Sequence, residues 1–130
     1  MKKNTRLFSA ILLTLLVLFV TGCSTNNIAP KSCQPTDLLI NKNWVVVTLK
    51  VNGVLDNNTG YQYFFKKDNT MDITAPNGTT KKYSWVWDSC TDFTRTAVDD
   101  GTITKFTIVS IDAKNLTFKS GGNEAVLIVK

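Results

Sequence analysis

Histidine is absent from all 130 residues of this sequence. Histidine is the side chain best suited to proton transfer near neutral pH, and a chain with few cysteines needs it to complete a common zinc site. The sequence also lacks the Gly-x-Ser-x-Gly turn of hydrolases, a phosphate-binding glycine loop and a Cys-x-x-Cys pair. We therefore predict a non-enzymatic protein with no catalytic residue, no metal site and no cofactor.

Paired carboxylates are the remaining candidates for acid–base chemistry or cation binding. Asp88 and Asp92 flank Cys90, while Asp99 and Asp100 stand next to a glycine. Asp and Gly favour tight turns, and Asp99 and Asp100 lack the alternating oxygen ligands of a calcium loop. We interpret both pairs as solvated turn residues. A calcium or acid–base role of Asp99 and Asp100 is the alternative.

The longest apolar run of the sequence lies near its start, over residues 10–20. Residues 1–22 also carry three basic residues and no acidic one. A basic start, a short apolar run and small residues before a cleavage site are typical of a secretory signal, and the run is too short for a stable membrane span. We therefore predict a signal peptide over residues 1–22.

The predicted signal runs into Val20-Thr21-Gly22-Cys23, which resembles the lipobox of bacterial lipoproteins: a branched residue, two small residues and a cysteine. The resemblance implies cleavage after Gly22, diacylglycerol on the Cys23 sulfur and a further acyl chain, such as palmitate, on the new amine. Two or more acyl chains hold a protein firmly on a membrane. The alternative is an ordinary signal peptide, or an uncleaved anchor, in which Cys23 has no role.

Ser24 follows this cysteine, and the next acidic residue is Asp37. By the usual sorting pattern of such lipoproteins, the resemblance implies lipid anchoring in the bacterial cell envelope, at the outer membrane. Residues 23–35 are rich in Ser, Thr, Asn and Pro, a composition typical of a flexible tether. We expect this tether to connect the lipid anchor to one folded domain over residues 36–130.

The net charge of the chain is weak once the signal is set aside. Removing residues 1–22 leaves 108 of the 130 residues, enough for one small domain, and lowers the net charge from +5 to +2. The remainder has no cluster of Lys and Arg, on which nucleic acid binding depends. We therefore predict no nucleic acid partner.

Two cysteines remain when Cys23 carries lipid, namely Cys33 and Cys90. In an exported protein an even remainder predicts a disulfide. The bridge would close a loop of 57 positions, which the chain-entropy model values at about 4 kcal/mol, and it would attach the end of the tether to the domain. The alternative is two unpaired thiols.

From Asn43 onward the sequence shows period-two alternation with regular turn signals, which predicts antiparallel strands. Thr36 or Asp37 is expected to cap one or two helical turns through Ile40 before the first strand. Eight strands with short links favour an all-β, up-and-down antiparallel barrel, because closing the sheet removes its exposed edges. The predicted strands are residues 44–51, 61–66, 71–74, 80–88, 93–97, 102–111, 115–119 and 125–130.

A short helix leading into Asn41-Lys42-Asn43-Trp44 and a β-branched strand resembles the opening of lipocalin-like barrels, in which a Gly-x-Trp motif packs the tryptophan across one barrel end. Asparagine stands here where that glycine would fall. The resemblance is closest to the compact lipocalin-like lipoproteins of bacteria and covers residues 38–130. It implies an eight-stranded barrel after a helical turn, and the larger relatives bind small hydrophobic molecules inside.

Aromatic residues gather on one face of two predicted strands, and Arg95 shares the face of Phe93 and Ala97 on a third. If these faces point inward, they line an apolar interior suited to a hydrophobic ligand with a polar end. Alternatively, the rings fill the core of a small barrel. Arg95 could meet an anionic headgroup or stack on an aromatic ring at the rim. The candidate ligand-binding residues are Tyr61, Tyr63, Phe65, Tyr83, Trp85, Trp87 and Arg95.

Two functions agree with these observations. The first is a membrane-anchored envelope lipoprotein that binds a small hydrophobic or amphipathic ligand inside its barrel. The alternative is a protein–protein interaction or inhibitory module of the cell envelope, with a filled core and binding loops over residues 54–60 or 98–101.

Overall fold

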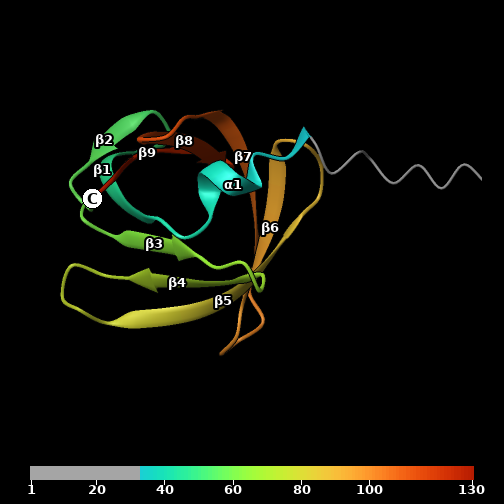
Figure 1. Cartoon of the computed structure of the whole chain (residues 1–130). Helices are drawn as coiled ribbons and strands as arrows, with labels where there is room; N and C mark the ends of the chain where they lie inside the picture. Colours follow the sequence, from blue (N-terminus) through green and yellow to red (C-terminus); the bar gives the residue numbers. More distant parts are fainter. Residues whose placement is uncertain (1–32) are drawn as a thin grey trace, which may run out of the picture.

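One short helix and nine antiparallel strands make up residues 33–130, the part of the chain that the computed structural model describes (Figure 1). The predicted signal peptide, Cys23 and most of the predicted tether lie outside these residues. No helix within residues 33–130 has the length and apolar character needed to cross a membrane. The elements are α1 (Thr36–Leu39), β1 (Asn43–Val51), β2 (Val54–Asp56), β3 (Gln62–Phe65), β4 (Thr70–Thr74), β5 (Thr80–Trp87), β6 (Asp92–Ala97), β7 (Ile103–Ile111), β8 (Asn115–Ser120) and β9 (Asn123–Val129).

The sheet closes into a barrel because its first strand pairs with its last. β1 pairs with β3 on one side, and β3 to β9 follow in sequence order. On its other side β1 pairs with β9 over almost its whole length, from Trp44 opposite Val129 to Val51 opposite Asn123. The predicted eight-stranded antiparallel up-and-down barrel, preceded by a helical turn, is therefore confirmed.

A ninth strand, β2, lies in a segment that the sequence led us to expect as a loop. It pairs with the second half of β1 through a two-residue turn, in which Asn52 and Gly53 have φ angles of 52° and 80°. Positive φ at both central residues is the type I′ geometry that Asn-Gly favours. A strand of three residues followed by two asparagines shows too little alternation to be recognised in the sequence.

Two β-bulges change which side chains point into the barrel. The register shifts at Val47 in β1 and at Val109 in β7, and both extra residues are exposed. After Val47 the inward position moves by one residue, so that Leu49 lies opposite the buried Ala125. Bulges bend a strand and increase its local twist, which helps a short strand to follow the curve of a small barrel.

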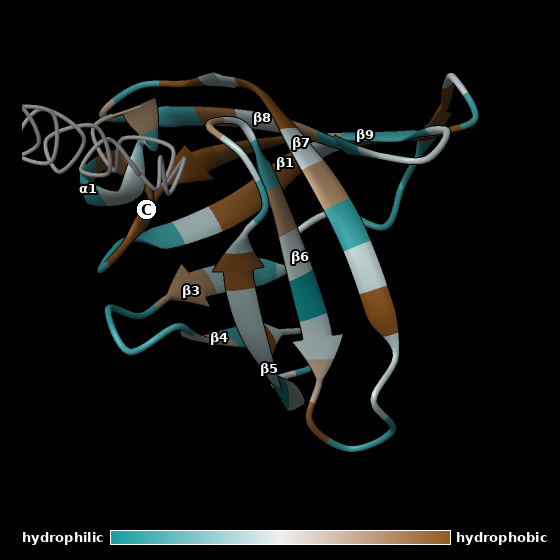
Figure 2. Cartoon of the chain, turned by 90° about the vertical axis from the view of Figure 1, so that its right-hand side faces the viewer, coloured by the Kyte–Doolittle hydropathy of each residue, from teal (hydrophilic) through white to brown (hydrophobic). Residues whose placement is uncertain are grey.

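The helix α1 lies across one end of the barrel, which we call the closed end (Figures 1 and 2). Trp44 is fully buried there, and its indole Nε1–H donates to the Leu39 carbonyl oxygen at 2.8 Å. The expected packing of Trp44 across a barrel end is therefore confirmed. The expected capping by Thr36 or Asp37 is wrong: Pro35 is the N-cap and makes no side-chain bond.

A disulfide and a side-chain hydrogen bond hold the start of the domain against this closed end. The predicted Cys33–Cys90 disulfide is confirmed, with a Cα–Cα distance of 5.2 Å, and it joins the residues before α1 to the turn between β5 and β6. The Thr36 hydroxyl accepts a hydrogen bond from Trp87 Nε1–H at 3.0 Å instead of capping the helix.

Aromatic rings fill the closed half of the barrel. Phe93 stacks on Phe106 with ring centroids 5.0 Å apart, and Phe65 meets the edges of Phe93 and Trp85 at 5.7 and 5.5 Å. These side chains are at most 6% exposed. Because offset and edge-to-face contacts are favourable for aromatic rings, this cluster provides a rigid floor for the space above it.

Aspartates close several of the turns between strands. In each case a carboxylate oxygen accepts a hydrogen bond from the backbone N–H two residues later, at 2.7 to 3.0 Å. These bonds favour the ionised form, and Asp68 also accepts from the Thr70 hydroxyl at 2.6 Å. The pKa values of these carboxyl groups are consequently lowered, chiefly by hydrogen bonds from the Thr70 hydroxyl and from the Thr102 and Lys114 N–H groups. The three residues are Asp68, Asp100 and Asp112.

We expect the barrel to lose stability in acid, and Asp112→Asn to reduce that loss. Because the folded pKa lies below the unfolded value of 3.8, these hydrogen bonds stabilise the fold above that pH and are lost as the pH falls through the folded value. Denaturant unfolding at pH 7 and pH 3 measures the difference. Asp37→Asn, at an exposed position of α1, is the control and should keep the difference seen in the unmodified chain.

Candidate ligand-binding pocket

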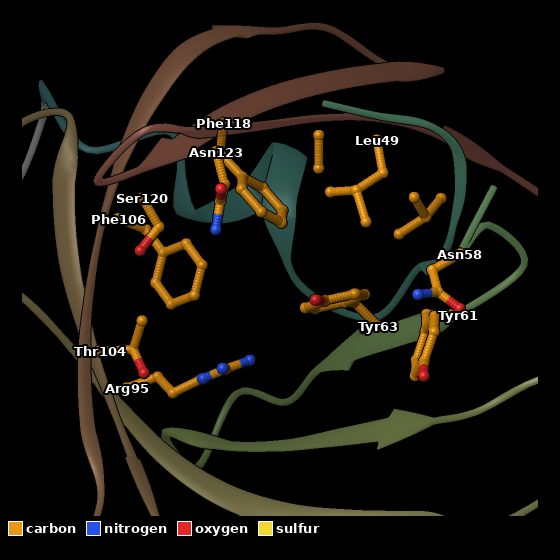
Figure 3. A pocket seen from close by; sticks show the side chains of 12 residues that line it. Leu49, Asn58, Tyr61, Tyr63, Arg95, Thr104, Phe106, Phe118, Ser120 and Asn123 are labelled. Carbon is orange, nitrogen blue, oxygen red and sulfur yellow. The ribbon is translucent and has the colours of Figure 1, made fainter. Parts of the chain in front are cut away.

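A pocket of about 330 Å³ lies in the half of the barrel opposite α1, which we call the open end (Figure 3). Its volume is at the lower limit of the range for small-molecule sites. The barrel is thus filled on one side of the aromatic floor and hollow on the other. The lining residues are Val46, Leu49, Asn58, Tyr61, Tyr63, Arg95, Thr104, Phe106, Phe118, Ser120, Asn123 and Ala125.

The pocket wall is apolar in its depth and polar towards its mouth. Phe106 and Phe118 belong to the aromatic floor, where their ring centroids lie 5.2 Å apart. Ser120 and Asn123 are register partners at the β8–β9 turn, next to the mouth. The lining contains no Asp, Glu or Lys, so Arg95 is its one charged residue.

Arg95 reaches the pocket from β6 and is held between two aromatic rings. Its guanidinium carbon lies 4.6 Å from the centre of the Tyr83 ring and 4.9 Å from the centre of the Phe106 ring. A guanidinium over aromatic faces is favourable by cation–π attraction and stacking. The Arg95 Nε atom is buried and has no hydrogen-bond partner among residues 33–130. The side chain therefore has a fixed position and an unused donor.

Tyr63 lies beside Arg95 on the pocket wall, and its ring meets the edge of Phe118 at 5.6 Å. Burial raises the pKa of the Tyr63 hydroxyl, and the neighbouring Arg95 guanidinium opposes the rise. The phenol therefore stays neutral at physiological pH, leaving Arg95 as a cation that no neighbouring tyrosinate neutralises.

Comparison with known proteins identifies the fold. A lipocalin-like protein from Bacteroides uniformis, of known crystal structure, superposes on this chain with a TM-score of 0.61 at 12% sequence identity. The superposition covers 70% of this chain and 97% of that protein. The fold is lipocalin-like. No protein-family model matches the sequence, and no curated protein matches it either.

The lipocalin-like barrel brings three of the predicted ligand-binding residues to the pocket: Tyr61, Tyr63 and Arg95. Tyr83 lies under the Arg95 guanidinium and supports it without lining the space. The remaining three belong to the closed half. Phe65 and Trp85 are packed in the core with 0% and 2% exposure, and Trp87 bonds to Thr36 beside α1.

The two alternatives for the aromatic faces are therefore both realised, in different halves of the lipocalin-like barrel. On β3 the face shared by Tyr63 and Phe65 runs from the pocket to the core. On β5, Trp85 and Trp87 lie at the closed end, and Tyr83 lies towards the open end. Whether an inward-facing ring lines the pocket or packs in the core depends on its position along the barrel axis. The alternation of side chains predicts the inward face but not that position.

Several pocket residues were not anticipated. The inward-facing Thr104 and Ser120 lie near strand ends, where small polar residues are also common in turns. Asn58 comes from the segment after β2, and no strand pattern marks it. The alternation of apolar and polar residues on β7 and β8 does predict that Phe106, Ile108, Leu116 and Phe118 face inward. This pattern could have identified Phe106 and Phe118 as candidate pocket residues.

Asp88, Asp99 and Asp100 lie in turns between strands, as expected, whereas Asp92 is the first residue of β6. Asp100 accepts the Thr102 N–H at 2.8 Å, and Asp92 accepts hydroxyl hydrogen bonds from Thr107 at 2.6 Å and from Ser89 at 2.8 Å. Those two hydroxyls lower the pKa of Asp92. No group of three or more acidic, cysteine or histidine side chains within residues 33–130 is arranged to hold a metal ion.

Proposed function

We propose that this protein is an envelope lipoprotein, lipid-anchored through Cys23, that binds a small amphipathic molecule in the open half of its lipocalin-like barrel. The observation that carries the binding proposal is the pocket itself, a space of about 330 Å³ above a packed aromatic floor. Apolar walls with a few convergent polar groups are typical of small-molecule sites. The lipobox-like sequence supports the anchor and the envelope location.

Native mass spectrometry tests the binding proposal directly. A chain that begins at Ser24 keeps every described residue, and secretion into an oxidising compartment allows the disulfide to form. We expect a bound mass that disappears on denaturation, or saturable binding of added amphiphiles by calorimetry. Calorimetry is preferable to tryptophan fluorescence, because none of the pocket-lining residues is a tryptophan.

A bulky residue at Ser120 is expected to abolish ligand binding. Ser120 lines the pocket from the end of β8, so that Ser120→Trp would fill the space with an indole ring. The matched control is Lys119→Trp, one residue earlier on the opposite, exposed face of the strand. We expect the first variant to lose binding at least tenfold and the second to bind like the parent chain. Equal binding by both variants would contradict the proposed location.

A second function, recognition of another envelope protein, is favoured by apolar residues at the open end. Val54, Leu55 and Val98 are each 70% exposed, on β2 and on the turn after β6. Val54 and Leu55 are adjacent on β2, and exposed apolar residues that lie together are typical of interaction sites. Site-specific photo-crosslinking from position 55 in intact cells tests this alternative. A specific crosslink to one envelope protein, lost in Leu55→Asp, would support it.

A further inference from the structure

We infer that the pocket selects an organic monoanion, a carboxylate on an apolar body, and binds its carboxylate to Arg95. This inference rests on the proposed ligand-binding function and adds the chemical class of the ligand. Its basis is a combination of three features. Arg95 has no ion-pair partner among the described residues, two aromatic rings hold its guanidinium, and the rest of the pocket wall is uncharged.

The described residues place no carboxylate beside the Arg95 charge. The ion pairs within residues 33–130 join Lys50 and Lys119 to Glu124, Lys66 to Asp72 and Lys81 to Asp99, and none involves Arg95. Hydrogen bonds from a guanidinium to an anion are stronger than those to a neutral group. An anionic ligand at the pocket-facing end of Arg95 would supply an ion-pair partner, whereas a neutral or cationic ligand would not.

The geometry favours a carboxylate in particular. Tyr83 and Phe106 hold the guanidinium, and Figure 3 shows the nitrogen-bearing end of Arg95 extending into the pocket. A carboxylate can accept two parallel hydrogen bonds from the two Nη groups at that end, whereas the buried Nε lies out of reach of the pocket. A single cation matches a single negative charge, and a phosphate monoester would bring close to two.

The rest of the pocket suits the apolar body of such a ligand. Val46, Leu49 and Ala125 lie on the wall across from Arg95, as Figure 3 shows for the labelled Leu49. The aromatic floor limits the depth, so the space accepts a short alkyl chain or a ring system more readily than a long extended chain. Tyr63 and Thr104 place further hydroxyl groups on the pocket wall.

Isothermal titration calorimetry with octanoate and 1-octanol tests the inference on the chain that begins at Ser24. The two probes have the same chain length and differ in the charge of the headgroup. We expect octanoate to bind about 10- to 100-fold more tightly than octanol, as a charge-assisted bidentate contact predicts. Arg95→Met should remove this preference while leaving octanol binding within a few-fold.

Two further variants distinguish a loss of charge from a loss of fold. Lys105→Met removes one positive charge from an exposed position of β7 and should keep the octanoate preference. Arg95→Lys keeps the charge without the planar edge, and we expect an intermediate affinity for octanoate. Thermal unfolding of each variant verifies that the barrel is intact.

The outcomes separate this inference from the proposed function. If octanoate and octanol bind equally, or if Arg95→Met and Arg95→Lys both keep the octanoate preference, the inference is overturned and the binding proposal stands. If neither probe binds and native mass spectrometry finds no bound molecule, both are overturned.

Discussion

Trp44→Ala is expected to lower the free energy of unfolding by about 4 kcal/mol, the usual loss for a large buried ring. Trp44 is fully buried at the closed end and carries the contact between α1 and the barrel. Its removal would leave a cavity and would also deprive the Leu39 carbonyl oxygen of its donor. Denaturant unfolding followed by circular dichroism measures the change.

Trp44→Phe separates the two contributions to this loss. Phenylalanine fills much of the space but has no Nε1–H for Leu39, so we expect a smaller loss of about 1 to 2 kcal/mol. The pocket lies at the other end, and neither variant should change the affinity for octanoate measured on the folded fraction. A loss below about 1 kcal/mol for Trp44→Ala would show that α1 does not stabilise the barrel.

Removing the disulfide is expected to have an effect of similar size. Cys33 and Cys90 close a loop of 57 positions, and the chain-entropy model assigns about 4 kcal/mol to a loop of this length. The double variant Cys33→Ser/Cys90→Ser should unfold at correspondingly lower denaturant concentration. The measurement compares it with the oxidised and the reduced parent chain.

The reduced parent chain is the internal control for the disulfide. It should unfold like the double variant, because both lack the covalent link and differ only by two oxygen-for-sulfur exchanges. If oxidised and reduced chains unfold alike, the link contributes nothing to stability. We expect α1 to detach first when the link is absent, because it is then held only by the buried Leu39 and by hydrogen bonds from Trp44 and Trp87.

Much of this architecture was accessible from the sequence because β-strands reveal their faces through alternation. Trp85 is buried and Val86 is 53% exposed, as the period of two required. Turn residues such as Asn52-Gly53 marked the strand ends, and the two cysteines that follow the lipobox-like sequence indicated the bridge. Such local rules were sufficient to predict eight strands and a closed sheet.

What the sequence could not supply were the features that depend on position along the barrel axis. The bulge at Val47 turns Leu49 into the pocket, although plain alternation from Val46 would have turned Thr48 inward. The division of the barrel interior into a filled and a hollow half depends on which aromatic side chains from different strands lie at the same height along the barrel axis. Arg95 was recognised as a residue that could stack on an aromatic ring, but the sequence did not show that the rings would be those of Tyr83 on β5 and Phe106 on β7.

The pairing of β1 with β9 also determines when the barrel can form. Trp44 and Val129 are register partners although 85 positions separate them. Contacts between such distant residues form against a large loop-closure entropy, and proteins rich in them fold slowly. Until β9 has emerged from the ribosome, β1 and β8 each have an unpaired edge. The barrel, and with it the pocket, is therefore complete only after the last strand of the chain is free to pair with the first.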